Sequence, residues 1–247
     1  MPALAVDLVR KQVDVIVTDG GAVNVAAQSA TSTIPIVAAT LQNPVESGLA
    51  KSLSHPGGNV TGFVLTVVET NAKRLDILKG AFANTQKVAL LWNKAAGTLF
   101  LEPVQKAGLA LKTQIEAFPV DGPGNLARAF ADVATSGADG LMTLPDGVFF
   151  NNRQIIVHLA ALSKLPAIYP EREYVEAGGL MSYGSVVAEN FRKVAGYVDK
   201  ILKGAKPGDL PIQEPTRYEL ILNLKTAQAL GISIPNSLLA LADQVIE

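Results

Sequence analysis

Short, wholly apolar runs alternate along this chain with longer segments whose apolar residues recur at helical spacing. The run at 34–39 (IPIVAA) contains no polar position, and 87–92 and 139–144 are mostly apolar. Such runs are typical of strands that are buried on both faces of a parallel sheet. Segment 69–82 instead places apolar residues every three or four positions, which predicts a helix. The alternation of strands and helices predicts βαβ units and parallel sheets.

The number of these units predicts two lobes rather than one sheet. The pattern predicts further strands at 13–17, 60–67, 113–120, 165–169, 179–184 and 218–223. It predicts further helices at 99–111, 126–136, 151–162 and 186–202. Segment 83–86 (ANTQ) separates an early set of units from a late one. We therefore expect a two-lobed α/β fold with a ligand cleft between the lobes. The expected lobes are 1–84 with 184–208, and 85–183 with 209–247.

Polar and aromatic residues follow the expected strands at their carboxyl ends, where open α/β sheets bind ligands. In the first lobe they are Asp19, Gly20, Gly21, Thr40, Gln42 and Asn43. In the second lobe they are Trp92, Asn93, Asp146, Tyr169, Glu171 and Tyr183. Two glycines before a helix allow close backbone approach and present free N–H groups to an anion. A tight strand-to-helix turn is the alternative for the glycines, and simple packing is the alternative for the aromatic residues.

Composition excludes several classes of function. The 247 residues are 49% hydrophobic and 17% charged, and the net charge of −1 gives no basic surface for nucleic acid. No apolar run is long enough to span a membrane. Cysteine is absent and only His55 and His158 are present, so we expect no metal site. His55 lies in a Ser-His-Pro-Gly-Gly turn, which favours a surface loop.

No catalytic constellation is evident either. Residues 122–127 match G-x-G-x-x-A, but Pro123 occupies the crowded turn and no acidic strand end follows about 20 residues later. No nucleophile stands in a recognisable motif beside a base. We therefore expect neither a cofactor nor catalytic residues, and interpret the strand ends as a binding pocket.

The sequence closely resembles the TrpX-like family of ABC-transporter substrate-binding proteins. The resemblance runs from end to end and rests on several segments, which are TSTIPIV (31–37), NPV (43–45), SGL (47–49), PGGNVTG (56–62), KRL (73–75), LPAIY (165–169), GGLMSYG (178–184), ILKG (201–204) and NLKTA (223–227). This family has the type I periplasmic-binding-protein fold. The resemblance implies a receptor that closes on a small organic molecule, such as an amino acid or an aromatic carboxylate, and delivers it to ABC permease subunits.

The resemblance also assigns the site. The turn Asp19-Gly20-Gly21-Ala22 and the turn 40–43 would contribute the first half, with a carboxylate at the glycines. The loop after Asn93, Asp146 and the segment near Tyr169 and Glu171 would contribute the second half, and an acidic side chain there suits a cation or a hydroxyl. Family members often carry Thr-Pro after the glycine, where this chain has Ala22-Val23.

The front of the chain differs from the family pattern. Family members begin with a secretion signal, a strand, a helix and a second strand, whereas this sequence opens on a helix. We therefore expect an uncovered sheet edge with exposed apolar surface in the first lobe, and self-association there or weak ligand binding. The resemblance implies a periplasmic location. Without a signal peptide the chain as given would stay in the cytoplasm.

Two other functions remain open. The same fold serves as the ligand-sensing domain of regulators, and an enzyme could be built on a doubly wound sheet. The sequence names neither the ligand nor the oligomeric state.

Overall fold

The computed structural model describes residues 2–98 and 100–247, and the chain forms two compact units. Unit 1 comprises Met1–Thr66 and Ser185–Arg217, and unit 2 comprises Val67–Gly184 and Tyr218–Glu247. These boundaries differ from the expected lobes at both crossings, because the first segment of unit 1 ends at Thr66 and its second segment extends to Arg217 instead of residue 208. The chain leaves unit 1 before helix α3 (Val67–Ala81) rather than after it. The reason is packing, because Leu75 and Leu78 of α3 belong to a core cluster of unit 2.

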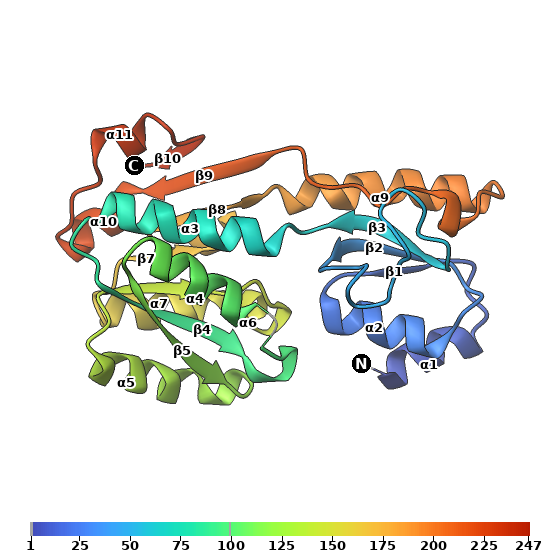
Figure 1. Ribbon diagram of the computed structural model, residues 1–247, viewed down its shortest axis with the longest axis horizontal. Coiled ribbons are helices and arrows are strands. Elements are labelled where there is room, and N and C mark those ends of the chain that lie inside the picture. Colours follow the sequence, from blue (N-terminus) through green and yellow to red (C-terminus); the bar gives the residue numbers. More distant parts are fainter. Residues whose placement is uncertain (1, 99) are drawn as a thin grey trace. The chain divides into compact units, whose positions relative to one another are not determined.

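Unit 1 is a small parallel sheet with helices on both faces (Figure 1). Its strands are β1 (Ile16–Thr18), β2 (Ile36–Leu41) and β3 (Val60–Val64), in the order β1-β2-β3. Its helices are α1 (Pro2–Arg10), α2 (Gly21–Ala30) and α9 (Val187–Leu202), followed by a short 3-10 turn at Pro207–Asp209. All six residues of β2 are buried, as its apolar run predicts.

Two core clusters cover the two faces of the unit 1 sheet. One combines Ile36, Ala38 and Leu41 of β2 with Ala27 of α2. The other combines Val37 and Ala39 with residues of α9, namely Val194, Tyr197 and Ile201. The alternation of adjacent β2 residues between the clusters follows from the two-residue repeat of a strand. Phe191, also on α9, is exposed and belongs to neither cluster.

The uncovered edge that the sequence predicts is present at β1. Within the described residues β1 pairs only with β2, so its other side is an edge of the sheet. Val17 lies in register with Val37, yet its side chain is 50% exposed. Helices α1 and α2 add exposed Leu4 and Val25 in the same unit.

Unit 2 is a larger sheet of seven strands in the order β10-β9-β8-β7-β6-β4-β5 (Figure 1). The strands are β4 (Lys87–Asn93), β5 (Gln114–Val120), β6 (Gly140–Thr143), β7 (Ala167–Tyr169), β8 (Met181–Ser185), β9 (Tyr218–Asn223) and β10 (Gln244–Ile246). From β5 to β8 each neighbouring pair runs parallel, as do β9 and β10. The sequence did not predict β10.

Helices cover both faces of this sheet. Besides α3 they are α4 (Leu101–Ala110), α5 (Leu126–Ser136), α6 (Gly147–Asn151), α7 (Arg153–Leu162), α8 (Arg172–Glu176), α10 (Leu224–Leu230) and α11 (Asn236–Leu239), with 3-10 turns at Lys94–Ala96 and Pro123–Asn125. Leu99, the expected start of the helix that becomes α4, lies outside the described residues. Within the described ranges, no helix is both long and apolar enough to cross a membrane.

Candidate functional site

The carboxyl ends of β1 and β2 meet in a hydrogen-bonded cluster in unit 1. The Thr40 hydroxyl donates to Asp19 Oδ1 and accepts the backbone N–H of Gly20 at 2.9 Å. Thr40 is 4% exposed, so this network is largely protected from water. The predicted residues Asp19, Gly20 and Thr40 are therefore brought together. Their bonds hold the strand ends in fixed positions beside the start of α2.

The amino end of helix α2 opens at this cluster. Gly20 has a φ of 96°, a conformation that glycine adopts without strain, and Gly21 is the first helical residue. The first N–H groups of a helix, here those of Gly21 and Ala22, have no partner inside the helix. A Cβ at Gly21 would lie 3.1 Å from Gln42 Oε1, so the predicted Gln42 also reaches this point. The arrangement offers N–H donors and a helix dipole, which suit an anion.

Asn24 belongs to this cluster although the sequence did not single it out. Its Nδ2 donates to the Thr40 carbonyl at 2.7 Å, and the residue is fully buried. Asn24 Oδ1 and Thr18 Oγ1 are buried and have no hydrogen-bond partner among the described residues. The predicted Asn43 turns away, because its Nδ2 donates to Glu46 Oε2 at 2.8 Å. A single asparagine near the start of a helix, such as Asn24, gives no sequence signal that it bonds to a neighbouring strand.

In unit 2 the ends of β4 and β6 are joined by a direct side-chain contact. Asn93 Nδ2 lies 3.1 Å from both carboxylate oxygens of Asp146. Asp146 is also the N-cap of α6, and its Oδ1 accepts the N–H of Val148 at 2.7 Å. Asn93 Oδ1 in turn accepts the N–H of Ala95 at 3.0 Å. Two residues that the sequence placed in the site, 53 positions apart, are thus preorganised together.

The predicted Tyr169 is a core residue. It is 1% exposed, and its ring stacks on Tyr174 with centroids 4.8 Å apart. Burial raises the pKa of Tyr169 well above its ordinary value. Tyr169 therefore packs in the core, which is the alternative that the sequence left open. It belongs to the cluster that contains Phe149 and Ile156.

Tyr174, which the sequence did not single out, lies among the charged residues of these strand ends. Its hydroxyl is buried without a hydrogen-bond partner among the described residues. The pKa of Tyr174 is raised, first by burial and then by the charges of Glu171 and Asp146. Arg153 acts in the opposite direction, and its guanidinium carbon lies 4.8 Å from the centre of the Phe150 ring.

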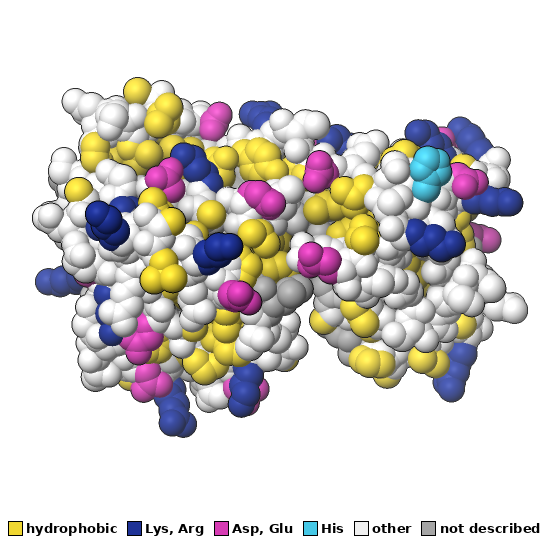
Figure 2. All heavy atoms as spheres, in the orientation of Figure 1, with side chains coloured by type: hydrophobic (Ala, Val, Ile, Leu, Met, Phe, Trp, Pro, Cys, Tyr) yellow, Lys and Arg dark blue, Asp and Glu magenta, His cyan; other side chains and the backbone are white. Residues whose placement is uncertain are grey.

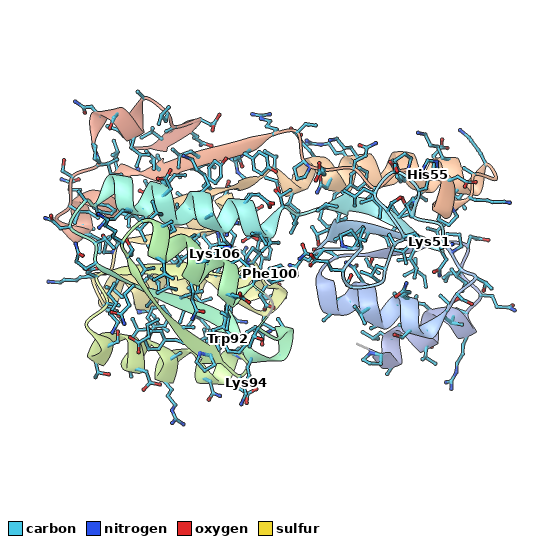
Figure 3. All side chains as sticks on the ribbon, viewed as in Figure 1. Lys51, His55, Trp92, Lys94, Phe100 and Lys106 are labelled. Carbon is cyan, nitrogen blue, oxygen red and sulfur yellow. The ribbon has the colours of Figure 1, made fainter. Side chains whose placement is uncertain are left out.

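Trp92 and Tyr183 lie on the other face of the sheet. Both are half-buried and pack against the core cluster that contains Leu90 and Met181. Figure 3 labels Trp92 at β4 and Phe100, which packs against the same cluster. The Trp92 indole N–H is buried and has no hydrogen-bond partner among the described residues. The Tyr183 ring stacks on Tyr218, with centroids 6.0 Å apart.

Glu171 precedes α8 and is half-buried. Burial lowers the pKa of Arg74, a buried residue of α3 that the sequence did not single out, and the negative charge of Glu171 acts in the opposite direction. Arg74 Nε donates to the Tyr183 carbonyl at 2.7 Å. No signal in the sequence predicts that Arg74 is buried, because α3 already has a regular stripe of apolar residues.

The histidines lie on the surface. His55 is exposed in the loop before β3 (Figure 3), and both basic and acidic side chains lie near it in the same view (Figure 2). His158 is exposed on α7. Within residues 2–98 and 100–247, no group of three or more His, Cys, Asp or Glu side chains is arranged to hold a metal ion.

Comparison with known proteins identifies the family of this chain. The model of the family described as ABC transporter substrate binding protein matches residues 2–246. The chain is 26% identical over 211 residues to the tyrosine-binding protein of Clostridioides difficile (strain R20291), which covers 84% of this chain. The chain spans 60% of the length of that curated relative.

Two solved structures are similar over 99% of this chain. A conserved domain protein from Vibrio cholerae O1 biovar El Tor is 27% identical, with a TM-score of 0.90 and 84% of its own chain covered. An ABC domain from Streptococcus pneumoniae in complex with L-Trp is 25% identical, also with a TM-score of 0.90 and 83% of its chain covered. These structures confirm the fold that the sequence resemblance predicts.

Proposed function

The chain belongs to the family of ABC transporter substrate binding proteins, and we propose that it is a solute receptor that closes its two units on a small organic ligand. The observation that carries the proposal is that each unit ends its parallel strands in a fixed polar cluster, Asp19–Gly20–Thr40 in one and Asn93–Asp146 in the other. Such clusters fix the orientation of a ligand. The ligand-bound state would then be recognised by the permease subunits of an importer.

The two clusters suggest the chemistry of the ligand. The N–H groups at the start of α2 suit a carboxylate, whereas Asp146 and Glu171 suit a cation or a hydroxyl group. An amino acid presents both. The relatives bind tyrosine and L-Trp, and this chain has 26% and 25% identity to them. We therefore propose an aromatic amino acid or a related aromatic carboxylate as the ligand, bound outside the cytoplasmic membrane as is typical of the family.

A binding screen tests this proposal. We expect L-tryptophan, L-tyrosine or an aromatic carboxylate to raise the melting temperature by about 5–10 °C at a ligand concentration of roughly 100 times Kd. Titration calorimetry then gives the stoichiometry, and chromatography of the ligand afterwards shows whether it was changed. Recovery of unchanged ligand supports a receptor. Conversion of the ligand would indicate an enzyme, and no shift with any aromatic compound would contradict the proposed ligand class.

We further propose that the β1 edge pairs with the β1 edge of a second copy. Proteins commonly protect edge strands with lysine or proline, and Ile16-Val17-Thr18 has neither. Val17 is 50% exposed. It lies on the face of the sheet where α9 packs against β2, and pairing with a second β1 would bury it.

Substituting Val17→Lys is expected to shift the chain from dimer to monomer, because a charge at the edge opposes strand pairing. Light scattering after size-exclusion chromatography over a range of concentrations measures this. Leu109→Lys, at an exposed leucine of unit 2, is the matched control and should leave the mass unchanged. A chain that is monomeric without substitution at all concentrations would remove the proposal.

A further inference from the structure

Strand β2 of unit 1 is irregular near its carboxyl end. Its register with β3 shifts between Ala38 and Leu41. Ala39 and Thr40 therefore lie opposite a single residue of β3, which is a β-bulge. The pairing of β2 with β1 also ends at Ala38. The backbone of Ala39 and Thr40 thus belongs to neither regular ladder, and other groups must fix it.

The bulge changes the direction of the side chains at this strand end. Regular alternation would place Leu41 on the face of the sheet that α9 covers. Instead it packs with Ala38 in the cluster on the α2 face. Thr40, between them, reaches the end of β1, where its hydroxyl donates to Asp19 Oδ1 and accepts the N–H of Gly20. Bulges beside binding sites commonly aim a side chain in this way.

Two buried asparagines bond the backbone of the bulge from opposite faces of the sheet. Asn24 Nδ2 donates to the Thr40 carbonyl at 2.7 Å. Asn190 Nδ2 donates to the Ala39 carbonyl at 3.1 Å. Asn24 is the fourth residue of α2 and Asn190 the fourth residue of α9, and these helices cover the two faces (Figure 1). Adjacent carbonyls of one strand are therefore held by amides from two layers.

Packing alone does not explain an amide at these two positions. Asn24 and Asn190 are 0% and 3% exposed. Asparagine is a weaker helix former than leucine or alanine, and a buried amide is costly unless it is hydrogen-bonded. A leucine would fill a similar volume, but it would leave a buried carbonyl of the bulge without this donor. The bulge is what requires the two amides.

We propose that Asn24 and Asn190 are positioning residues that clamp the β2 bulge and so hold the Thr40 hydroxyl in its binding geometry. This inference rests on the proposed ligand-binding function, in which the cluster around Thr40 orients the ligand. Asn190 is the more informative of the two, because it acts from the α9 face and only through the Ala39 backbone. A group that is held in place before the ligand arrives costs less to order on binding.

Amide hydrogen exchange of the ligand-free chain tests the clamp. The Gly20 N–H donates to Thr40 Oγ1 at 2.9 Å, and the Ile36 N–H donates to the Asn59 carbonyl at 2.7 Å within the regular ladder. In Asn190→Ala we expect exchange at Gly20 to accelerate at least about 10-fold more than exchange at Ile36. Equal acceleration of both amides would mean that Asn190 contributes only to the stability of the unit, and would overturn the proposal.

Val194→Ala is the matched control, because Val194 lies one turn later on α9 and is also buried against the sheet. It should destabilise the unit without accelerating Gly20 more than Ile36. Asn190→Ser is a milder second variant, since its hydroxyl can bond within α9 while its side chain is too short to replace the amide. It should show the same selective effect at Gly20 even where Asn190→Ala folds poorly.

The effect on binding is measured by titration calorimetry with L-tryptophan. Asn190→Ala should weaken binding by about 10-fold, and Val194→Ala by less than about 2-fold. In a Thr40→Val background, Asn190→Ala should add little, because the hydroxyl that it positions is gone. Independent effects of the two substitutions would contradict the clamp. If L-tryptophan does not bind the unsubstituted chain, the proposed ligand fails, and exchange at Gly20 still decides whether the clamp exists.

Discussion

Substituting Gly62→Ala is expected to destabilise unit 1 by about 4 kcal/mol or more, which is enough to unfold it in many proteins. Gly62 lies in the middle of β3, in register with Ala38 of β2, and has a φ of 144°. A Cβ there would lie 2.0 Å from the Ala38 carbonyl oxygen. No rotamer relieves this clash, because the backbone fixes the position of Cβ and the carbonyl is itself part of the backbone. Denaturant unfolding measures the loss.

Gly196→Ala is the matched control in the same unit. Gly196 lies within α9, and a Cβ there meets no atom within 4 Å. Alanine is favoured over glycine inside a helix by about 1 kcal/mol, so this variant should be as stable as the unsubstituted chain or slightly more so. If Gly62→Ala proved equally stable, the close approach of β3 to β2 would be wrong.

Most strands of both sheets could be predicted because their signals are local. The run around Ile36 has no polar position, and β2 is buried throughout. The lobe boundary could not be predicted in the same way. The stripe of α3 shows that one face is buried but not against which sheet, and Leu75 and Leu78 pack in unit 2. The three-residue strand β10 is too short to show any periodicity.

The residues of the candidate site also fall into those that local signals predict and those that they do not. Thr40 lies near the end of strand β2 and Asp146 follows β6, and strand ends of one parallel sheet meet at one edge, so their neighbours could be named from the sequence. Arg74 and Tyr174 could not, because their roles depend on partners that lie far away in the sequence or in another layer. Arg74 reaches a carbonyl 109 positions away. Tyr174 stands among Glu171, Arg172, Glu173 and Glu176, a composition typical of a solvated helix, yet its ring is fully buried.

The sequence also could not separate the two roles of an aromatic side chain. Trp92, Tyr169 and Tyr183 all follow or end strands, and each suited both a pocket wall and a core. The two-residue repeat of the strands decides which face each side chain occupies. Tyr169 falls under α7 and α8 on the face of Phe149, whereas Trp92 and Tyr183 fall on the face of α3. Packing of the covering helices, rather than residue type, sets their exposure.

Asp146 is expected to have the largest effect on ligand binding, and two substitutions separate its roles. Asp146→Ala removes the carboxylate and with it the cap of α6, because Asp146 Oδ1 accepts the N–H groups of Val148 and Phe149. Asp146→Ser removes the carboxylate but keeps an oxygen that caps a helix well. The free energy of unfolding should therefore fall by about 1–2 kcal/mol in the alanine variant and by less than about 0.5 kcal/mol in the serine variant.

The affinity for ligand should fall by about 100-fold in both variants, because each removes a charged group that the Asn93 amide holds in place. Titration calorimetry with the ligand from the binding screen measures this, and denaturant unfolding measures the cap. The comparison is informative because stability and affinity are expected to separate. If the serine variant bound ligand as the unsubstituted chain does, Asp146 would be a helix cap alone, and the Asn93–Asp146 pair would belong to the scaffold of unit 2 rather than to its binding site.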